Sequence, residues 1–105
     1  MIPYGKQSIS SKDIEAVVSV LESEFLTQGP QCVLFEKAFC KQVLADFAVS
    51  ANSATSSLHI ACLALDVGPD DIVWTSPISF VASSNCALYC GASIDFVDIN
   101  SNTHN

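Results

Sequence analysis

Three short apolar runs, separated by segments with helical spacing, constrain the fold of this chain most strongly. The runs are residues 46–51 (DFAVSA), 71–76 (DIVWTS) and 93–99 (SIDFVDI). Short bounded apolar runs are typical of buried strands. Strands that alternate with helices favour a mostly parallel sheet with right-handed crossovers. The pattern therefore predicts a β-α-β-α-β unit of the α/β class.

The segments between these runs have the spacing of helices. Apolar residues at positions 58, 61, 62 and 65 recur at i, i+3, i+4 and i+7, which predicts a helix beginning near Thr55. A second helix is expected over residues 79–90, where Gly91 closes it.

Two more helices are predicted before the first strand. Residues 9–21 carry Ser10 as an N-cap, with Asp13 at the third helical position. The next helix is expected to begin at Pro30, which suits a first helical turn, and to end near Leu44.

Charge excludes one class of partner. The net charge is −7 and only four residues are Lys or Arg, so the chain has few cations to neutralise the phosphates of a nucleic acid. A small anionic ligand remains compatible with this charge, because backbone N–H groups at a helix N-terminus bind anions without a charged side chain.

The cysteine pattern and the N-terminus indicate a reducing compartment. The five cysteines include no CxxC pair, which favours reduced thiols over a disulfide frame or a zinc site. No metal site is predicted. MIPYGKQSISSKD lacks the apolar core of a signal peptide, and no apolar run approaches the roughly 20 residues that span a bilayer. We therefore expect a cytoplasmic protein without a membrane partner.

Residues 52–59, NSATSSLH, form the first candidate site. They follow a predicted strand and open a predicted helix, and ligands of parallel α/β sheets bind outside the carboxyl ends of the strands. Backbone N–H groups at that helix start, with the hydroxyl of Thr55 or Ser53, suit a phosphate. The alternative is that Ser53 or Thr55 only caps the helix.

A second polar turn, TSPISFVASSN (residues 75–85), follows the next strand. It places Phe80 just beyond the strand end, where an aromatic ring can stack on a flat ligand. The alternative is that Phe80 is an ordinary core residue.

The two turns together resemble the DegT/DnrJ/EryC1/StrS family of sugar aminotransferases. That family commonly shows a Ser-Gly-Thr-x-Ala-Leu turn, a Pro-x-x-Thr-Phe-Val-Ala-Thr turn and a Gly-Ala-x-Pro-x-Phe-x-Asp strand. Here they correspond to SATSSL (53–58), PISFVAS (77–83) and GASIDFVD (91–98). NSATS, PISFVA, FLTQGP and FEKAFC look most like the family's pseudaminic acid branch.

The resemblance implies the N-terminal part of a fold-type I transferase that depends on pyridoxal 5′-phosphate (PLP). Residues 1–45 would be an N-terminal helical segment, and residues 46–105 the incomplete first part of the large α/β domain. Ser53, Ala54 and Thr55 would hold the cofactor phosphate, and Phe80 would stack on the pyridine ring. Ala54 replaces the common Gly, so a positive φ there would cost about 1 kcal/mol or more.

The resemblance also implies the substrates and the assembly. The enzyme would convert the 4-keto group of a UDP-sugar to an amine, with glutamate as the usual amino donor, and would act as a homodimer. The residues near the nucleotide sugar would be Tyr4, Glu24, Phe25, Leu26 and Thr27.

The catalytic lysine and the acid partner of the pyridine nitrogen are absent from the matching motifs. The family's versions lie downstream of this segment, and the lysines present are Lys6, Lys12, Lys37 and Lys41. No catalytic residue is therefore assigned, and the chain alone is expected to be inactive. Two alternatives stay open: a non-catalytic α/β fragment that binds a phosphorylated ligand, and a family member with histidine in place of lysine that dehydrates or deoxygenates sugars.

Overall fold

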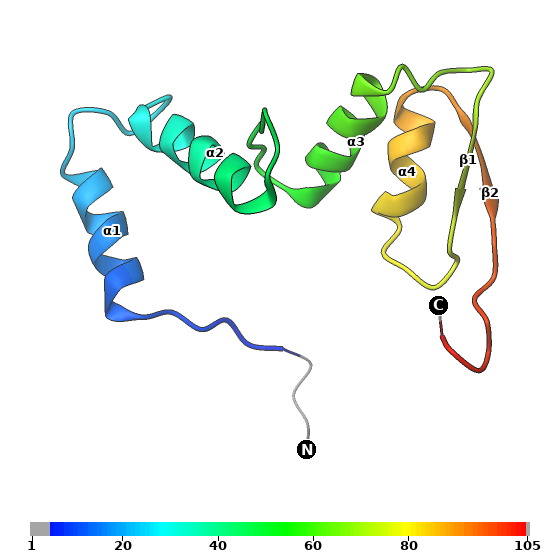
Figure 1. The fold of residues 1–105 in the computed structure, drawn as a ribbon, viewed down its shortest axis with the longest axis horizontal. Coiled ribbons are helices and arrows are strands. Elements are labelled where there is room, and N and C mark those ends of the chain that lie inside the picture. Colours follow the sequence, from blue (N-terminus) through cyan, green and yellow to red (C-terminus); the bar gives the residue numbers. More distant parts are fainter. Residues whose placement is uncertain (1–4, 105) are drawn as a thin grey trace. The chain divides into compact units, whose positions relative to one another are not determined.

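The structure is a computed structural model that describes residues 5–104. The chain divides into two compact units, Met1–Val49 and Ser50–Asn105. Figure 1 shows helices α1 and α2 in the first unit, and helices α3 and α4 with strands β1 and β2 in the second. The division into residues 1–45 and 46–105 remains a prediction from the family resemblance.

The first helix, α1 (Ser11–Leu21), begins where its cap predicts. The backbone N–H of Ser10 donates to Asp13 Oδ2 at 2.7 Å, and the backbone N–H of Asp13 donates to Ser10 Oγ at 3.4 Å. These reciprocal bonds form a capping box, which satisfies N–H groups that have no partner within the helix. The predicted cap is confirmed.

The second helix, α2 (Pro30–Val43), also matches its prediction. Pro30 occupies the first turn, where its missing N–H costs no hydrogen bond. Leu44 ends the helix in the left-handed region with φ 57°, and the N–H of Ala45 donates to the carbonyl of Cys40 at 3.0 Å. None of the residues of α1 or α2 is buried.

The second unit contains α3 (Ala54–Ala64), β1 (Ile72–Thr75), α4 (Ala82–Tyr89) and β2 (Ser93–Phe96). The strands pair in parallel, with Ile72 opposite Ser93 and Thr75 opposite Phe96. Helix α4 connects them and contacts both strands and α3. The structure thus confirms the α/β class with a parallel sheet.

The buried core of this unit is small. Among the described residues its apolar members are Ala82, Cys86, Ala87 and Ala92. All four side chains are short, so helix and sheet approach closely but bury little apolar area. Large apolar side chains stay exposed, including Trp74 at 69% and Ile72 at 64% on the strand β1.

The prediction of a strand over residues 46–51 is wrong for this chain. The sheet has two strands in the order β1-β2, and residues 46–51 are not part of it. A strand exists through hydrogen bonds to a neighbouring strand, and the described residues offer this segment no such neighbour.

The helix predicted over residues 79–90 begins later, at Ala82. The chain first makes a turn after Pro77, in which the N–H of Ser83 donates to the carbonyl of Phe80 at 3.0 Å. This turn leaves Phe80 outside α4. Within residues 5–104, no helix combines the length and apolar character that a bilayer crossing requires.

Candidate phosphate-binding site

The N-terminus of α3 is built by a cap at Ser53. Ser53 has extended backbone (φ −157°, ψ 157°), and its Oγ accepts a hydrogen bond from the N–H of Ser56 at 3.2 Å. The carbonyl of Ser53 accepts from the N–H of Ser57 at 3.0 Å, which is the first bond of the helix. The structure therefore realises the capping role that the sequence left open for Ser53.

Capping leaves donors at the helix start without acceptors. No described residue accepts a hydrogen bond from the backbone N–H of Ala54 or of Thr55, or shares one with the Thr55 hydroxyl. The Thr55 side chain is half-buried. Two backbone donors and one hydroxyl at a helix N-terminus suit a phosphate, which the helix dipole also favours. The cap at Ser53 therefore leaves other groups of the same turn available to a phosphate.

Ala54 fits this turn without strain. It is the first residue of α3, and it is not among the described non-glycine residues with positive φ, which are Gln28, Leu44, Asp66 and His104. The cost considered for the replacement of Gly by Ala therefore does not arise in this backbone.

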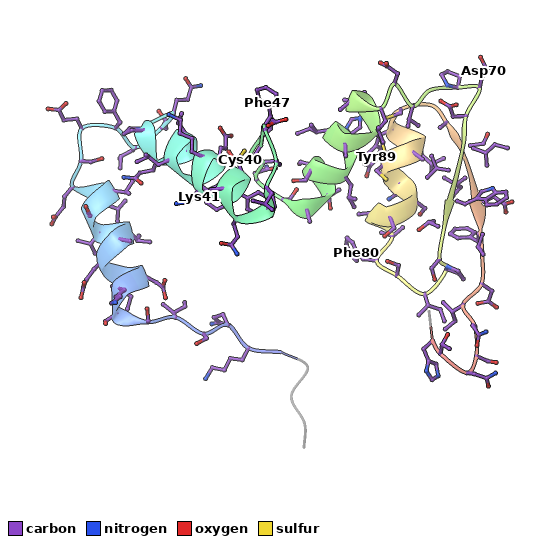
Figure 2. All side chains as sticks on the ribbon, viewed as in Figure 1. Cys40, Lys41, Phe47, Asp70, Phe80 and Tyr89 are labelled. Atoms are coloured by element: carbon purple, nitrogen blue, oxygen red, sulfur yellow. The ribbon has the colours of Figure 1, made fainter. Side chains whose placement is uncertain are left out.

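Phe80 lies at the same end of the unit as the start of α3. Figure 2 shows Phe80 in the connection that leads into α4, at the end of the unit where β1 ends and both α3 and α4 begin. The side chain is 73% exposed. Phe80 is therefore not part of the buried core among the described residues, and the stacking of its ring on a flat ligand stays a prediction.

The residues predicted to lie near the sugar belong to the first unit. Glu24, Phe25, Leu26 and Thr27 form part of the connection between α1 and α2, and Tyr4 lies outside the described residues. Their contact with a substrate stays a prediction.

Asn52, which was not among the predicted site residues, participates in the cap. Its Oδ1 accepts from Ser56 Oγ at 2.8 Å and from Ser53 Oγ at 3.4 Å. The sequence signal for such a bond is an Asn directly before a Ser N-cap, since Asn side chains often form hydrogen bonds with nearby turn residues.

Three thiols gather where α3 meets α4. Burial raises the pKa of the Cys62 thiol, and the neighbouring thiols of Cys86 and Cys90 raise it further. Neutral thiols are poor nucleophiles and metal ligands. Among residues 5–104, no three His, Cys, Asp or Glu side chains are placed to share a metal ion.

The second unit is a parallel α/β fold with hydrogen-bond donors at the start of α3 that have no acceptor among the described residues, and sequence comparison identifies the family of the chain. The family model of the DegT/DnrJ/EryC1/StrS aminotransferase family matches residues 7–105, so the chain belongs to that family.

Two members of known name are similar to this chain over nearly its whole length. The chain is 42% identical over 99 residues to the UDP-4-amino-4,6-dideoxy-N-acetyl-beta-L-altrosamine transaminase of Campylobacter jejuni strain 81-176, covering 94% of this chain and 26% of that protein. It is 40% identical over 104 residues to the spore coat polysaccharide biosynthesis protein SpsC of Bacillus subtilis, covering 99% of this chain and 27% of that protein.

Solved structures agree with the assignment. The PLP-form of the putative sugar aminotransferase Spr1654 from Streptococcus pneumoniae superimposes with a TM-score of 0.89 at 31% identity, covering 98% of this chain and 26% of that one. A form of the same protein with pyridoxamine phosphate (PMP) superimposes equally well. The chain therefore spans about a quarter of the length of the relatives that it matches, 26% for Spr1654.

Proposed function

We propose that this chain is the N-terminal part of a PLP-dependent aminotransferase that converts a 4-keto UDP-sugar to a 4-amino sugar. The observation that carries the proposal is the start of α3, where the N–H groups of Ala54 and Thr55 and the Thr55 hydroxyl lack acceptors among the described residues. Membership of the DegT/DnrJ/EryC1/StrS aminotransferase family supports the phosphate of PLP as the ligand that we propose for these donors.

The chain's own residues would bind and orient the cofactor. The N–H groups of Ala54 and Thr55, with the Thr55 hydroxyl, would hold its phosphate, and the exposed ring of Phe80 would stack on its pyridine ring. PLP, when bound, supplies an electron sink that allows an amino group to move between substrates. Ser53 would bind the same phosphate through its backbone N–H, and it would also shape the turn as the N-cap of α3.

The remaining machinery is proposed to lie outside residues 1–105. Amino transfer on PLP needs a lysine amine, and none of the four lysines here, at positions 6, 12, 37 and 41, stands in a motif that matches the family's catalytic lysine. The chain would therefore form a part of an active centre that a longer polypeptide completes.

The substrate proposal rests on the relatives. A transaminase of a UDP-4-amino sugar is 42% identical to this chain, and a protein of spore coat polysaccharide biosynthesis is 40% identical. We therefore propose a role in nucleotide-sugar and cell-surface glycan synthesis, in the pseudaminic acid pathway. Glutamate would be the amino donor, the full enzyme a homodimer, and its location the cytoplasm.

The test begins with the source DNA beyond the codon for Asn105. The complete reading frame would be expressed, and its PLP binding measured by the visible absorption of the holoenzyme. Amination of a 4-keto UDP-sugar with glutamate would then be followed by mass spectrometry. Binding together with amination is the expected result.

The other outcomes separate the alternatives. If the downstream sequence has histidine in place of lysine and the enzyme dehydrates or deoxygenates sugars, the reaction is not transamination. A stop codon directly after Asn105 would refute transamination by this chain and leave a phosphate-binding fragment. Absence of PLP binding by the complete product would overturn the cofactor assignment.

A further inference from the structure

The hydroxyl protons of the cap can be counted from the distances around Asn52. Asn52 Oδ1 lies 2.8 Å from Ser56 Oγ and 3.4 Å from Ser53 Oγ, and the two serine oxygens lie 3.0 Å apart. A serine hydroxyl has one proton to donate. The shortest contact assigns the proton of Ser56 to Asn52, so the proton of Ser53 must fill the contact with Ser56 or with Asn52.

Both serine protons are therefore used inside this triangle. In this structure the hydroxyls of Ser53 and Ser56 thus contact each other and Asn52, although both residues lie at the start of the helix. The donors that remain are the N–H groups of Ala54 and Thr55 and the hydroxyl of Thr55.

We propose that Asn52 is a positioning residue of the phosphate site: it binds the hydroxyls of Ser53 and Ser56 and thereby holds the turn with the donors of Ala54 and Thr55 exposed. This inference rests on the proposed function, since it concerns the same cofactor phosphate. It assigns the serine hydroxyls to the shape of the turn and the threonine hydroxyl to the ligand.

The test compares single and double variants of the complete enzyme that carries this segment. Asn52→Ala and Ser56→Ala both delete the 2.8 Å bond. Each is expected to raise the dissociation constant for PLP about fivefold, the size of effect typical for one neutral hydrogen bond. The double variant should be no weaker than either single variant, because residues in one hydrogen-bond network are not additive.

Ser57→Ala is the matched control. Its hydroxyl donates to the Ser53 carbonyl at 3.2 Å and not to Asn52, so the dissociation constant should not change. The phosphorus NMR resonance of bound PLP gives a readout that general destabilisation would not move. It should shift in Asn52→Ala and Ser56→Ala and stay in place in Ser57→Ala.

The outcomes distinguish this inference from the proposed function. If the wild-type enzyme binds no PLP, the proposed function fails and the inference fails with it. If the wild type binds PLP, but the affinity and phosphorus resonance of Ser56→Ala match it, the role of Asn52 alone is overturned. Additive losses in the double variant would also overturn it. Ser56→Ala keeps the test decisive should Asn52→Ala fail to fold.

Discussion

Thr55 is the residue on which the proposed cofactor site depends most, because it offers two donors without acceptors among residues 5–104. We predict that Thr55→Val in the complete enzyme raises the dissociation constant for PLP about 10- to 100-fold, since a hydrogen bond to a charged group contributes about 1.5–3 kcal/mol. Valine keeps the shape and removes only the hydroxyl. Titration of the apoenzyme with PLP measures the effect, and an unchanged constant would contradict the assignment.

The thiols of Cys32 and Cys62 should differ in reactivity, because they differ in exposure and in the groups around them. Cys32 is exposed, whereas burial and neighbouring thiols hold the pKa of Cys62 above its ordinary value of 9.0. Only the thiolate reacts with a disulfide reagent. At pH 8 we expect Cys32 to react first and Cys62 more slowly, with the rate at Cys62 rising as the pH passes above 9.0. Mass spectrometry of labelled peptides would show the order, and equal rates at both sites would be inconsistent with a shielded thiol.

Among single elements, the helix starts were predictable from residues within one turn, whereas the strand depends on a partner elsewhere in the chain. The starts of α1 and α2 follow from Ser10 and Pro30, because caps and first-turn prolines act within one helical turn. The strand over residues 46–51 could not be predicted from local signals, since a strand requires a neighbouring strand and the sequence of the segment does not specify one. For Asn52, its place directly before a Ser N-cap signals a bond within the turn, but the partners Ser53 and Ser56 depend on side-chain rotamers, which the sequence does not specify.

The capping box of α1 makes its helicity depend on pH. Hydrogen bonds from the backbone and hydroxyl of Ser10 lower the pKa of Asp13 from 3.8. Because the folded pKa lies below the unfolded one, the contribution to helix stability is complete above pH 3.8 and is lost as the pH falls through the lower value. In a peptide of residues 6–24, circular dichroism should show helix content falling over this acid range.

The matched comparison is the same peptide with Asp13→Asn, which keeps the size of the side chain and removes its carboxylate. The pH dependence of the difference between the two peptides belongs to Asp13. Parallel titration curves for wild type and variant would show that the box contributes nothing to α1 in solution.

For the whole molecule, the balance of buried and exposed apolar surface determines whether the isolated chain is stable in water. Each unit exposes many large apolar side chains, and the buried core among the described residues of the second unit contains only short ones. A two-stranded sheet is marginal in water without further strands or packing, and large apolar patches mark surfaces that other protein covers. The three quarters of the relatives' length that this chain does not match would offer such cover.

The single tryptophan, Trp74, makes this balance measurable. It lies on β1 with 69% of its surface exposed, so the isolated 105-residue chain should show red-shifted emission and strong quenching by acrylamide. We also expect this chain to aggregate, because its exposed apolar faces can associate without a specific partner. In the complete enzyme, the emission lost on Trp74→Phe should be blue-shifted and protected from acrylamide. A monomeric isolated chain that unfolds cooperatively would contradict the prediction, since it would show that the small alanine-rich core holds the fold without further cover.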